Sequence, residues 1–105
     1  MASMISIYIT CSDKAEAEKI SRHLLDQRLI ASANMFPVSS MYWWEAKLQK
    51  GREVAILAKS VRENFEKVRQ AVRAIQSYDI PCIVSYEAAA DADFADWVSG
   101  ELRKK

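Results

Sequence analysis

The sequence has few of the residues on which several common kinds of site depend. Its 105 residues include only two glycines, Gly51 and Gly100, and one histidine, His23. Two isolated glycines cannot form a glycine-rich phosphate-binding loop, which excludes a nucleotide site of that kind. A single histidine cannot supply two imidazole ligands from one chain. The two cysteines, Cys11 and Cys82, are too few for a disulfide scaffold.

The sequence also lacks an excess of charge of either sign. Lysine and arginine total 15 and aspartate and glutamate total 14, which gives a formal net charge of +1. A nucleic-acid-binding domain of this size usually has a marked basic excess, so we expect no nucleic-acid partner. There is no run of about 18 apolar residues and no visible signal segment, so we expect no membrane partner. These features together predict a soluble cytoplasmic protein.

The composition is that of one folded domain, because half of the residues are hydrophobic and 28% are charged. We therefore expect residues 1–105 to form a single domain. Apolar residues alternate over Ile5–Thr10, which predicts a strand. Helical spacing over Lys14–Gln27 predicts an amphipathic helix, and Asp13 as its N-cap with Glu16 three residues later resembles a capping box.

The central part of the chain predicts extended structure. We expect strands at Leu29–Phe36, Ser39–Leu48 and Glu53–Lys59, with a turn at Gln49–Arg52. The run Val54–Ala58 is apolar without alternation, which favours burial on both of its faces.

A second helix and a last strand complete the pattern. The apolar residues of this helix recur at spacings of four, three, four and three: Val61, Phe65, Val68, Val72 and Ile75. Ser60 and Glu63 match a capping box before it. Cys82–Glu87 predicts a strand, and Asp93 can cap a short terminal helix with Phe94, Trp97 and Val98 on its apolar face. The order predicts an α+β, ferredoxin-like βαββαβ fold with an extended central hairpin and a short C-terminal helix.

Two helices can cover only one face of such a sheet. Large side chains are expected on the other face, from Tyr8 and from either Tyr42 and Trp44 or Met41 and Trp43. A chain this short has no third layer, so we expect another copy of the chain to cover them and assign Tyr42, Trp43 and Trp44 to the interface. The alternative is that the aromatics fold back onto their own sheet edge.

Several blocks of the sequence resemble the CutA divalent-cation tolerance family. They are Leu29–Pro37 and Ser40–Lys47, which includes the letters YWWE, with shorter matches at Thr10–Asp13, Ile56–Ser60 and Tyr78–Pro81. The resemblance implies a ferredoxin-like subunit of a homotrimer, similar to the PII-type signalling proteins, in which long hairpins lock the neighbours together. It also implies tolerance to divalent cations, copper especially, with metal binding and no established catalytic reaction, so we expect no enzyme.

The candidate metal ligands are the two cysteines. Cys11 lies ahead of the first predicted helix, where the partial positive charge at the N-terminus lowers the pKa of a thiol. Cys82 stands where the family commonly has an acidic residue, and a thiol there would favour soft metals. For both cysteines the alternative is a packing role. The family's usual cysteine and histidine ligands are replaced here by Ser32 and Gln76, and its glycine after YWWE is replaced by Ala46.

A small polar cleft between subunits is the candidate ligand site. Its expected members are the polar residues that match the family pattern: Asn34, Glu45, Lys59, Tyr78 and Asp79. The sequence leaves two main functions open. One is a CutA-type trimer that binds copper, another divalent metal or a small ligand in this cleft, in response to metal ions. The other is a structural or PII-like signalling trimer that binds no metal.

Overall fold

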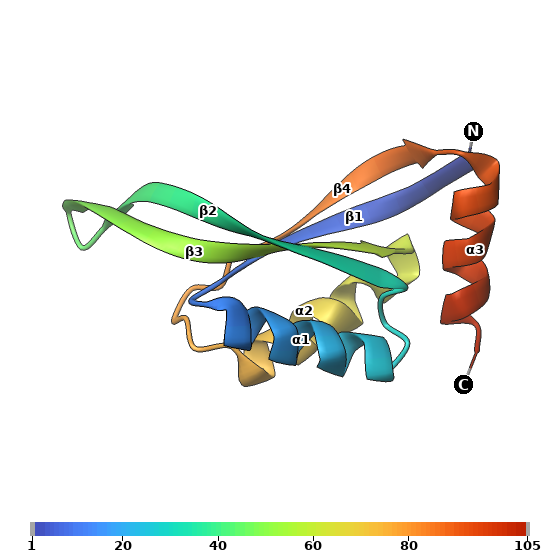
Figure 1. The fold of residues 1–105 in the computed structure, drawn as a ribbon, viewed down its shortest axis with the longest axis horizontal. Helices are drawn as coiled ribbons and strands as arrows, with labels where there is room; N and C mark the ends of the chain where they lie inside the picture. Colours follow the sequence, from blue (N-terminus) through green and yellow to red (C-terminus); the bar gives the residue numbers. More distant parts are fainter. Residues whose placement is uncertain (1, 105) are drawn as a thin grey trace.

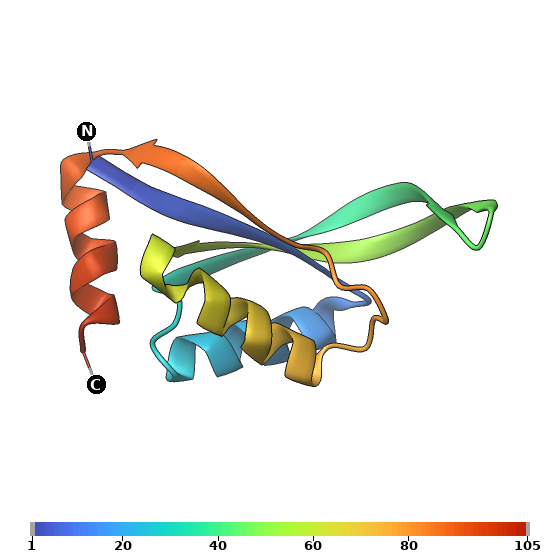
Figure 2. The ribbon, with the colours of Figure 1, turned by 180° about the vertical axis from the view of Figure 1, so that it is seen from behind.

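The computed structural model describes residues 2–104 and has the expected α+β, ferredoxin-like architecture. Its elements in chain order are β1 (Ala2–Cys11), α1 (Lys14–Asp26), β2 (Ser32–Trp44), β3 (Lys47–Ser60), the 3-10 turn η1 (Arg62–Asn64), α2 (Phe65–Ile75), β4 (Ile83–Ala90) and α3 (Ala92–Leu102). The helices α1 and α2 cover one face of a four-stranded antiparallel sheet, and α3 stands at one end of it (Figures 1 and 2).

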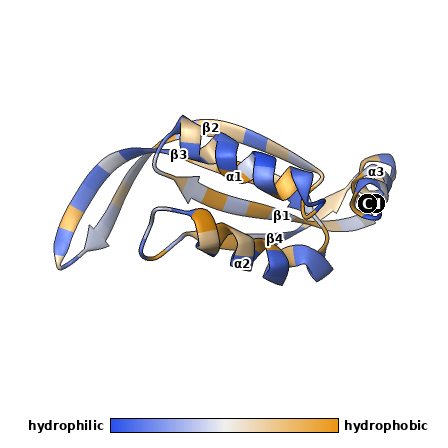
Figure 3. Ribbon diagram, turned by 90° about the horizontal axis from the view of Figure 1, so that it is seen from below, coloured by the Kyte–Doolittle hydropathy of each residue, from blue (hydrophilic) through white to orange (hydrophobic). Residues whose placement is uncertain are grey.

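The core lies between the sheet and the two helices. In the sheet order β2-β3-β1-β4, the central strand β1 points Ile5, Ile7 and Ile9 toward the helices, as the alternation predicts. Ile20 on α1 and Val68 on α2 are also fully buried. Seen from the helix side, β1 is hydrophobic and the outward turns of α1 are hydrophilic (Figure 3). The amphipathic patterns therefore fold as expected.

The face of the sheet turned away from α1 and α2 is not covered within the chain. Tyr8 on β1 pairs with Leu57 on β3 and with Val84 on β4, so the three side chains share this face. Phe36 and Tyr86 belong to the same face and are exposed. The expectation of large side chains on the open face is confirmed.

The central hairpin differs from the prediction. β2 and β3 are continuous strands of 13 and 14 residues, and they pair from Ser32 and Lys59 to Trp44 and Lys47. The turn consists of Glu45 and Ala46, so the predicted turn at Gln49–Arg52 is wrong. The predicted gap between the strands Leu29–Phe36 and Ser39–Leu48 is also wrong, because β2 runs through Pro37 as an edge strand, where a missing N–H is tolerated.

The N-cap of the first predicted capping box is confirmed, although Glu16 accepts from the N–H of Ser12 and not from that of Asp13, and the second capping box is wrong. Asp13 caps α1, since its Oδ1 accepts a hydrogen bond of 2.8 Å from the N–H of Glu16. Ser60 instead ends β3, and its hydroxyl donates to the carbonyl of Leu29 at 2.7 Å. The helix α2 begins only at Phe65, without a side-chain cap. The Ser60 hydroxyl is buried at the end of β3 and bonded to Leu29, so it does not cap α2.

The terminal helix α3 begins earlier than predicted. Its N-cap position is Asp91, without a side-chain cap bond, and Asp93 lies in its first turn, so the predicted cap is wrong. Val98 is buried as expected, whereas Phe94 and Trp97 contact each other at the surface.

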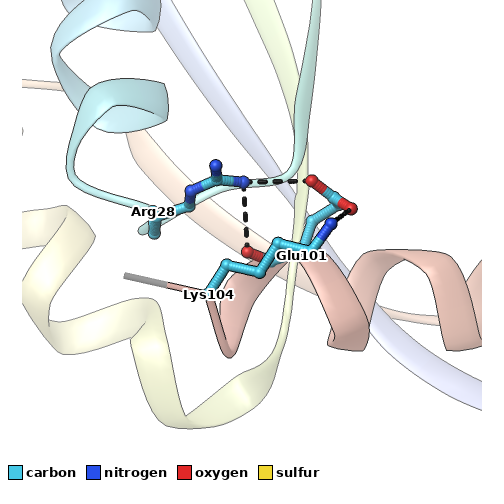
Figure 4. A network of polar contacts seen from close by, with 3 residues as sticks. All are labelled: Arg28, Glu101 and Lys104. Atoms are coloured by element: carbon cyan, nitrogen blue, oxygen red, sulfur yellow. Dashed lines mark hydrogen bonds and ion pairs between the residues drawn. The ribbon is translucent and has the colours of Figure 1, made fainter.

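A polar network ties α3 to the segment that follows α1 (Figure 4). Arg28 donates from Nη1 to Oε1 of Glu101 at 3.0 Å, and Lys104 donates to Oε2 of Glu101 at 2.6 Å.

Over residues 2–104, no helix has the length and hydropathy needed to cross a membrane.

Candidate functional site

The hairpin extends beyond the body of the molecule as a two-stranded arm, which we define as residues 38–53. The pairing of β3 with β1 ends where Val54 meets Cys11, so the rest of the hairpin has no third strand (Figure 1). The large apolar side chains of the arm are exposed: Trp43 by 74%, Met41 by 63%, Leu48 by 54%, Tyr42 by 47% and Trp44 by 37%. The arm is therefore an apolar surface that a single chain leaves in water.

A groove of about 800 Å³ lies between this arm and the loop that joins α2 to β4. Its lining residues come from β1, the arm and the loop: Thr10, Ser39, Ser40, Met41, Tyr42, Trp43, Trp44, Glu53, Ser77, Tyr78, Asp79, Ile80 and Cys82. This volume is in the range of small-ligand pockets in proteins, so we take the groove as the candidate site.

One hydrogen bond connects the two walls of the groove. The hydroxyl of Tyr78 donates to Oε2 of Glu53 at 2.6 Å, across 25 positions of sequence. Burial, this hydrogen bond and the charge of Glu53 raise the pKa of Tyr78. Burial also raises the pKa of Tyr8, with smaller effects from Cys82 and Glu53. The charged residues lining the groove are Glu53 and Asp79, so its ionised groups are negative.

Glu16 holds the loop at the rear of the groove in place. Its carboxylate accepts hydrogen bonds from the N–H of Ser12 at 2.9 Å, from the Ser12 hydroxyl at 3.1 Å and from the N–H of Ser77 at 2.9 Å. Burial opposes ionisation of Glu16, but the hydrogen bonds outweigh it and lower the pKa of the carboxyl group. The loop before α1 and the loop after α2 are thereby joined through one carboxylate.

The two candidate metal ligands have different surroundings. Cys11 is fully buried in the core, and burial, followed by the charge of Glu16, raises its pKa to about 12. The expectation of a lowered pKa is therefore wrong, because desolvation outweighs the helix terminus. Cys82 is half-buried and lines the groove. Within residues 2–104, no three His, Cys, Asp or Glu side chains are placed to hold a metal ion.

The five expected cleft residues fall in three places in one copy of the chain. Tyr78 and Asp79 line the groove. Glu45 lies in the turn at the tip of the arm. Asn34 on β2 and Lys59 on β3 lie on the open face of the sheet, where burial lowers the pKa of Lys59. One copy therefore places only two of the five in the groove, and it brings Asn34 and Lys59 together elsewhere on the sheet.

Glu53 is the charged groove residue that the sequence analysis did not identify. It is the first residue of a predicted strand, and nothing in the sequence pairs it with Tyr78. Gln76 and Ser32, where the resemblance implies a histidine and a cysteine, lie outside the groove. Gln76 donates from Nε2 to the carbonyl of Thr10 at 2.5 Å, and Ser32 begins β2. Gln76 thus holds the loop to β1.

Comparisons with known proteins agree over almost the whole chain. The family model for the CutA1 divalent ion tolerance protein matches residues 5–101. The divalent-cation tolerance protein CutA of Archaeoglobus fulgidus is 40% identical over 93 residues, covering 88% of this chain and 91% of that protein. The CutA of Pyrococcus horikoshii is 32% identical over 102 residues, covering 96% of this chain and all of that protein.

Solved structures give the same result for the fold. The structure of the periplasmic divalent cation tolerance protein CutA from Archaeoglobus fulgidus superposes with a TM-score of 0.92 at 36% identity, covering 97% of this chain and all of that one. The crystal structure of CutA1 from Pyrococcus horikoshii gives a TM-score of 0.91 at 31% identity, covering 96% of this chain and all of that one. The chain therefore belongs to the CutA1 divalent ion tolerance family.

Proposed function

We propose that this protein acts in divalent-cation tolerance as a homotrimer without catalytic activity. The copies bind a divalent cation, copper among them, through side chains from more than one chain. The observation that carries the proposal is the exposed apolar surface of the arm, because it needs a protein partner. The relatives named above supply the function, since they are divalent-cation tolerance proteins.

Burial of the arm provides a driving force for assembly. Tyr42, Trp43 and Trp44 are each more than one-third exposed, and the open face of the sheet adds Phe36 and Tyr86. Burying a large apolar side chain contributes about 1.5–3 kcal/mol, so a few such residues per copy can support a stable interface. Another copy of the chain is the economical partner, because it offers the same apolar surfaces.

The cation would be held where copies meet. A single copy lacks three converging ligands over residues 2–104, but a trimer presents each side chain three times. Cys82 and Asp79 line the groove, and they are the ligands that we assign to the cation, a thiol for soft and a carboxylate for harder metals. Cys11 does not fit this role, because it is buried with a raised pKa.

The experiment measures assembly and metal binding on the same sample. Sedimentation of the metal-free protein at micromolar concentration should give a trimer, and a monomer would overturn the assembly. Calorimetric titration with copper(I), copper(II) and zinc should give at least one dissociation constant below about 10 μM, equivalent to ~7 kcal/mol. Weaker binding of all three metals would overturn the cation site. Cys82→Ala should weaken the binding, with Cys11→Ala as its matched control.

The second candidate is a structural or PII-like signalling trimer that binds no metal. Gln76 favours it, because this side chain fastens the loop to the carbonyl of Thr10 at a position where the family commonly has histidine. A trimer that fails to bind all three metals would support this candidate. We also propose that the protein works in the cytoplasm, although one structural relative is called periplasmic. Fractionation of cells tests the location.

A further inference from the structure

We propose that Lys59, on the open face of the sheet, holds an anionic oxygen group, a carboxylate or a small oxyanion, between two copies of the assembled protein. This site rests on the proposed trimer, because another copy of the chain covers that face. It takes an anion and lies away from the groove, so it differs from the proposed cation site. It is enclosed by the assembly and does not need an uncovered surface.

Lys59 lies in a row of hydrogen-bond donors that crosses all four strands. Ser6 on β1 pairs with Lys59 on β3 and with Tyr86 on β4, and Lys59 pairs with Ser32 on β2. Residues paired in this way share a face, with neighbouring Cβ atoms about 4.5–5.5 Å apart. Asn34, two positions along β2 from Ser32, belongs to the same face. The row therefore combines an ammonium group with hydroxyl and amide groups that donate to an anionic oxygen.

The described strands place no carboxylate beside this ammonium group. Glu87 on β4 pairs with Ile5, whose side chain lies in the core, so Glu87 belongs to the opposite face. Glu53 is on the same face but six positions along β3 from Lys59, about 20 Å away, and it already accepts from Tyr78. None of the ion pairs within residues 2–104 includes Lys59. One copy therefore supplies no counter-charge over these residues.

Covering the open face makes a counter-charge necessary. Lys59 is already half-buried in one copy, and burial lowers its pKa. Removing a charged group further from water is unfavourable unless an opposite charge accompanies it. Ser6 and Ser32 can complete the hydrogen bonds of an anion, but they carry no charge of their own. The row thus suits a carboxylate or phosphate group and does not suit a metal cation.

Two sources can supply the anionic group. One is a small anion from solution. The other is Glu45 of the neighbouring copy, which is exposed at the tip of the arm and belongs to no ion pair within residues 2–104. In one copy, Glu45 and Lys59 are separated by most of β3, about 40 Å, so a contact between them requires two copies.

The first measurement is calorimetric titration of the assembled full chain with sodium phosphate, with sodium chloride at equal ionic strength as the reference. A free anion predicts a dissociation constant below about 1 mM, and Lys59→Met should weaken this binding at least about tenfold. Lys59→Arg keeps the charge and should bind phosphate as the parent does. Lys67→Met, an exposed lysine on α2, is the matched control and should leave binding unchanged.

The second measurement is sedimentation over a dilution series. If Glu45 of the neighbouring copy is the anion, Glu45→Gln and Lys59→Met should each dissociate at a concentration about tenfold higher than the parent, and the double variant no further. Exchanging the charges, Glu45→Lys with Lys59→Glu, should restore the assembly that each single reversal weakens. If the anion comes from solution, Glu45→Gln should sediment as the parent does. Circular dichroism identifies any misfolded variant, and Lys59→Gln then replaces Lys59→Met.

Either phosphate binding that depends on Lys59 or restoration by the exchanged charges supports the site and identifies its source. Equal phosphate binding by the parent and Lys59→Met shows an adventitious ion only. If that result, or no phosphate binding, is combined with a charge exchange that restores nothing, the site is overturned and the proposed trimer stands. A parent protein that sediments as a monomer overturns the trimer and the site together.

Discussion

At the scale of single residues, Glu16 has a structural role that its sequence position only partly reveals. Asp13 and Glu16 are recognisable as a capping box because they stand three positions apart at the start of an amphipathic helix. The bond from the N–H of Ser77 to the Glu16 carboxylate crosses 61 positions, and no local pattern predicts it. Local spacing therefore identified the cap, while the connection to the groove depends on the tertiary fold.

Substitution of Glu16 tests this connection. Glu16→Gln should lower the free energy of unfolding at pH 7 by about 1 kcal/mol, allowing for screening at a partly exposed site. The pKa of Glu16 is lowered from its usual 4.5, so its stabilising effect is complete above pH 4.5 and disappears as the pH falls through the folded-state value. Urea denaturation between pH 3 and pH 7 measures both effects.

The control for this prediction is another glutamate on the same helix. Glu18 forms only an exposed pair with Lys14 at 3.8 Å, so Glu18→Gln should change stability by a few tenths of a kcal/mol at most. A Glu16→Gln protein whose stability falls below pH 4.5 as steeply as that of the parent would contradict the assignment.

The two cysteines should differ in reactivity. Because the pKa of Cys11 is about 12, only about one in ten thousand Cys11 side chains is ionised at pH 8, and the side chain is fully buried. Iodoacetamide at pH 8 should therefore alkylate Cys82, which lines the groove, and spare Cys11 in the folded protein. Peptide mass spectrometry reads the result, with both cysteines modified in denaturant as the control. Rapid alkylation of Cys11 in the folded protein would contradict its burial in the core.

At the scale of elements, the sequence predicted the amphipathic elements well and the hairpin poorly. Apolar residues recur with the period of a strand in β1 and with that of a helix in α1, and the structure has these elements. In the hairpin, the polar segment Gln49–Arg52 contains a glycine and looks like a turn. The actual turn residues, Glu45 and Ala46, carry no such signal. The misplaced turn also concealed Glu53, since its contact with Tyr78 needs both the arm and the loop in place.

The hairpin turn contains a correctable strain. Glu45 and Ala46 have φ angles of 52° and 64°, the left-handed region that a two-residue hairpin turn requires and that glycine adopts most readily. Ala46→Gly should raise the free energy of unfolding by about 0.5–1 kcal/mol, measured by urea denaturation. Ala74→Gly on an exposed turn of α2 is the matched control and should lower it by about 1 kcal/mol. A decrease in both variants would contradict the turn geometry.

The terminal helix α3 depends on a contact with the segment after α1. Arg28 donates to both the side chain and the carbonyl of Glu101, at 3.0 and 3.4 Å. Arg28→Met keeps the apolar stem but removes these bonds, so amide hydrogen exchange at the end of α3 should accelerate roughly twofold or more. Arg22→Met, which breaks only an exposed pair with Asp26, should leave exchange in α3 unchanged. Equal exchange in both variants would show that packing of Ala95 and Val98 holds the helix without the Arg28 contact.

At the scale of the whole molecule, the elongated shape determines where partners can act. The chain extends 44 Å along its longest axis and 26 and 21 Å along the others, with the arm at one end and α3 at the other (Figure 2). The body has its own core between the sheet and the helices, while the arm has apolar side chains without one. The fold of one copy should therefore tolerate changes on the arm that assembly does not.

Trp43 provides the last test, because it is the most exposed of the large hydrophobic residues in the part of the chain that the structure describes. Its ring contributes little to the fold of one copy, but its burial in a trimer would contribute about 2–3 kcal/mol per copy. Trp43→Asp should therefore sediment as a monomer at micromolar concentration and keep the far-ultraviolet circular dichroism of the parent. Leu25→Asp, the same kind of change on α1, should remain a trimer. If Trp43→Asp sediments as the parent trimer does, the assignment of Trp43 to the interface is contradicted.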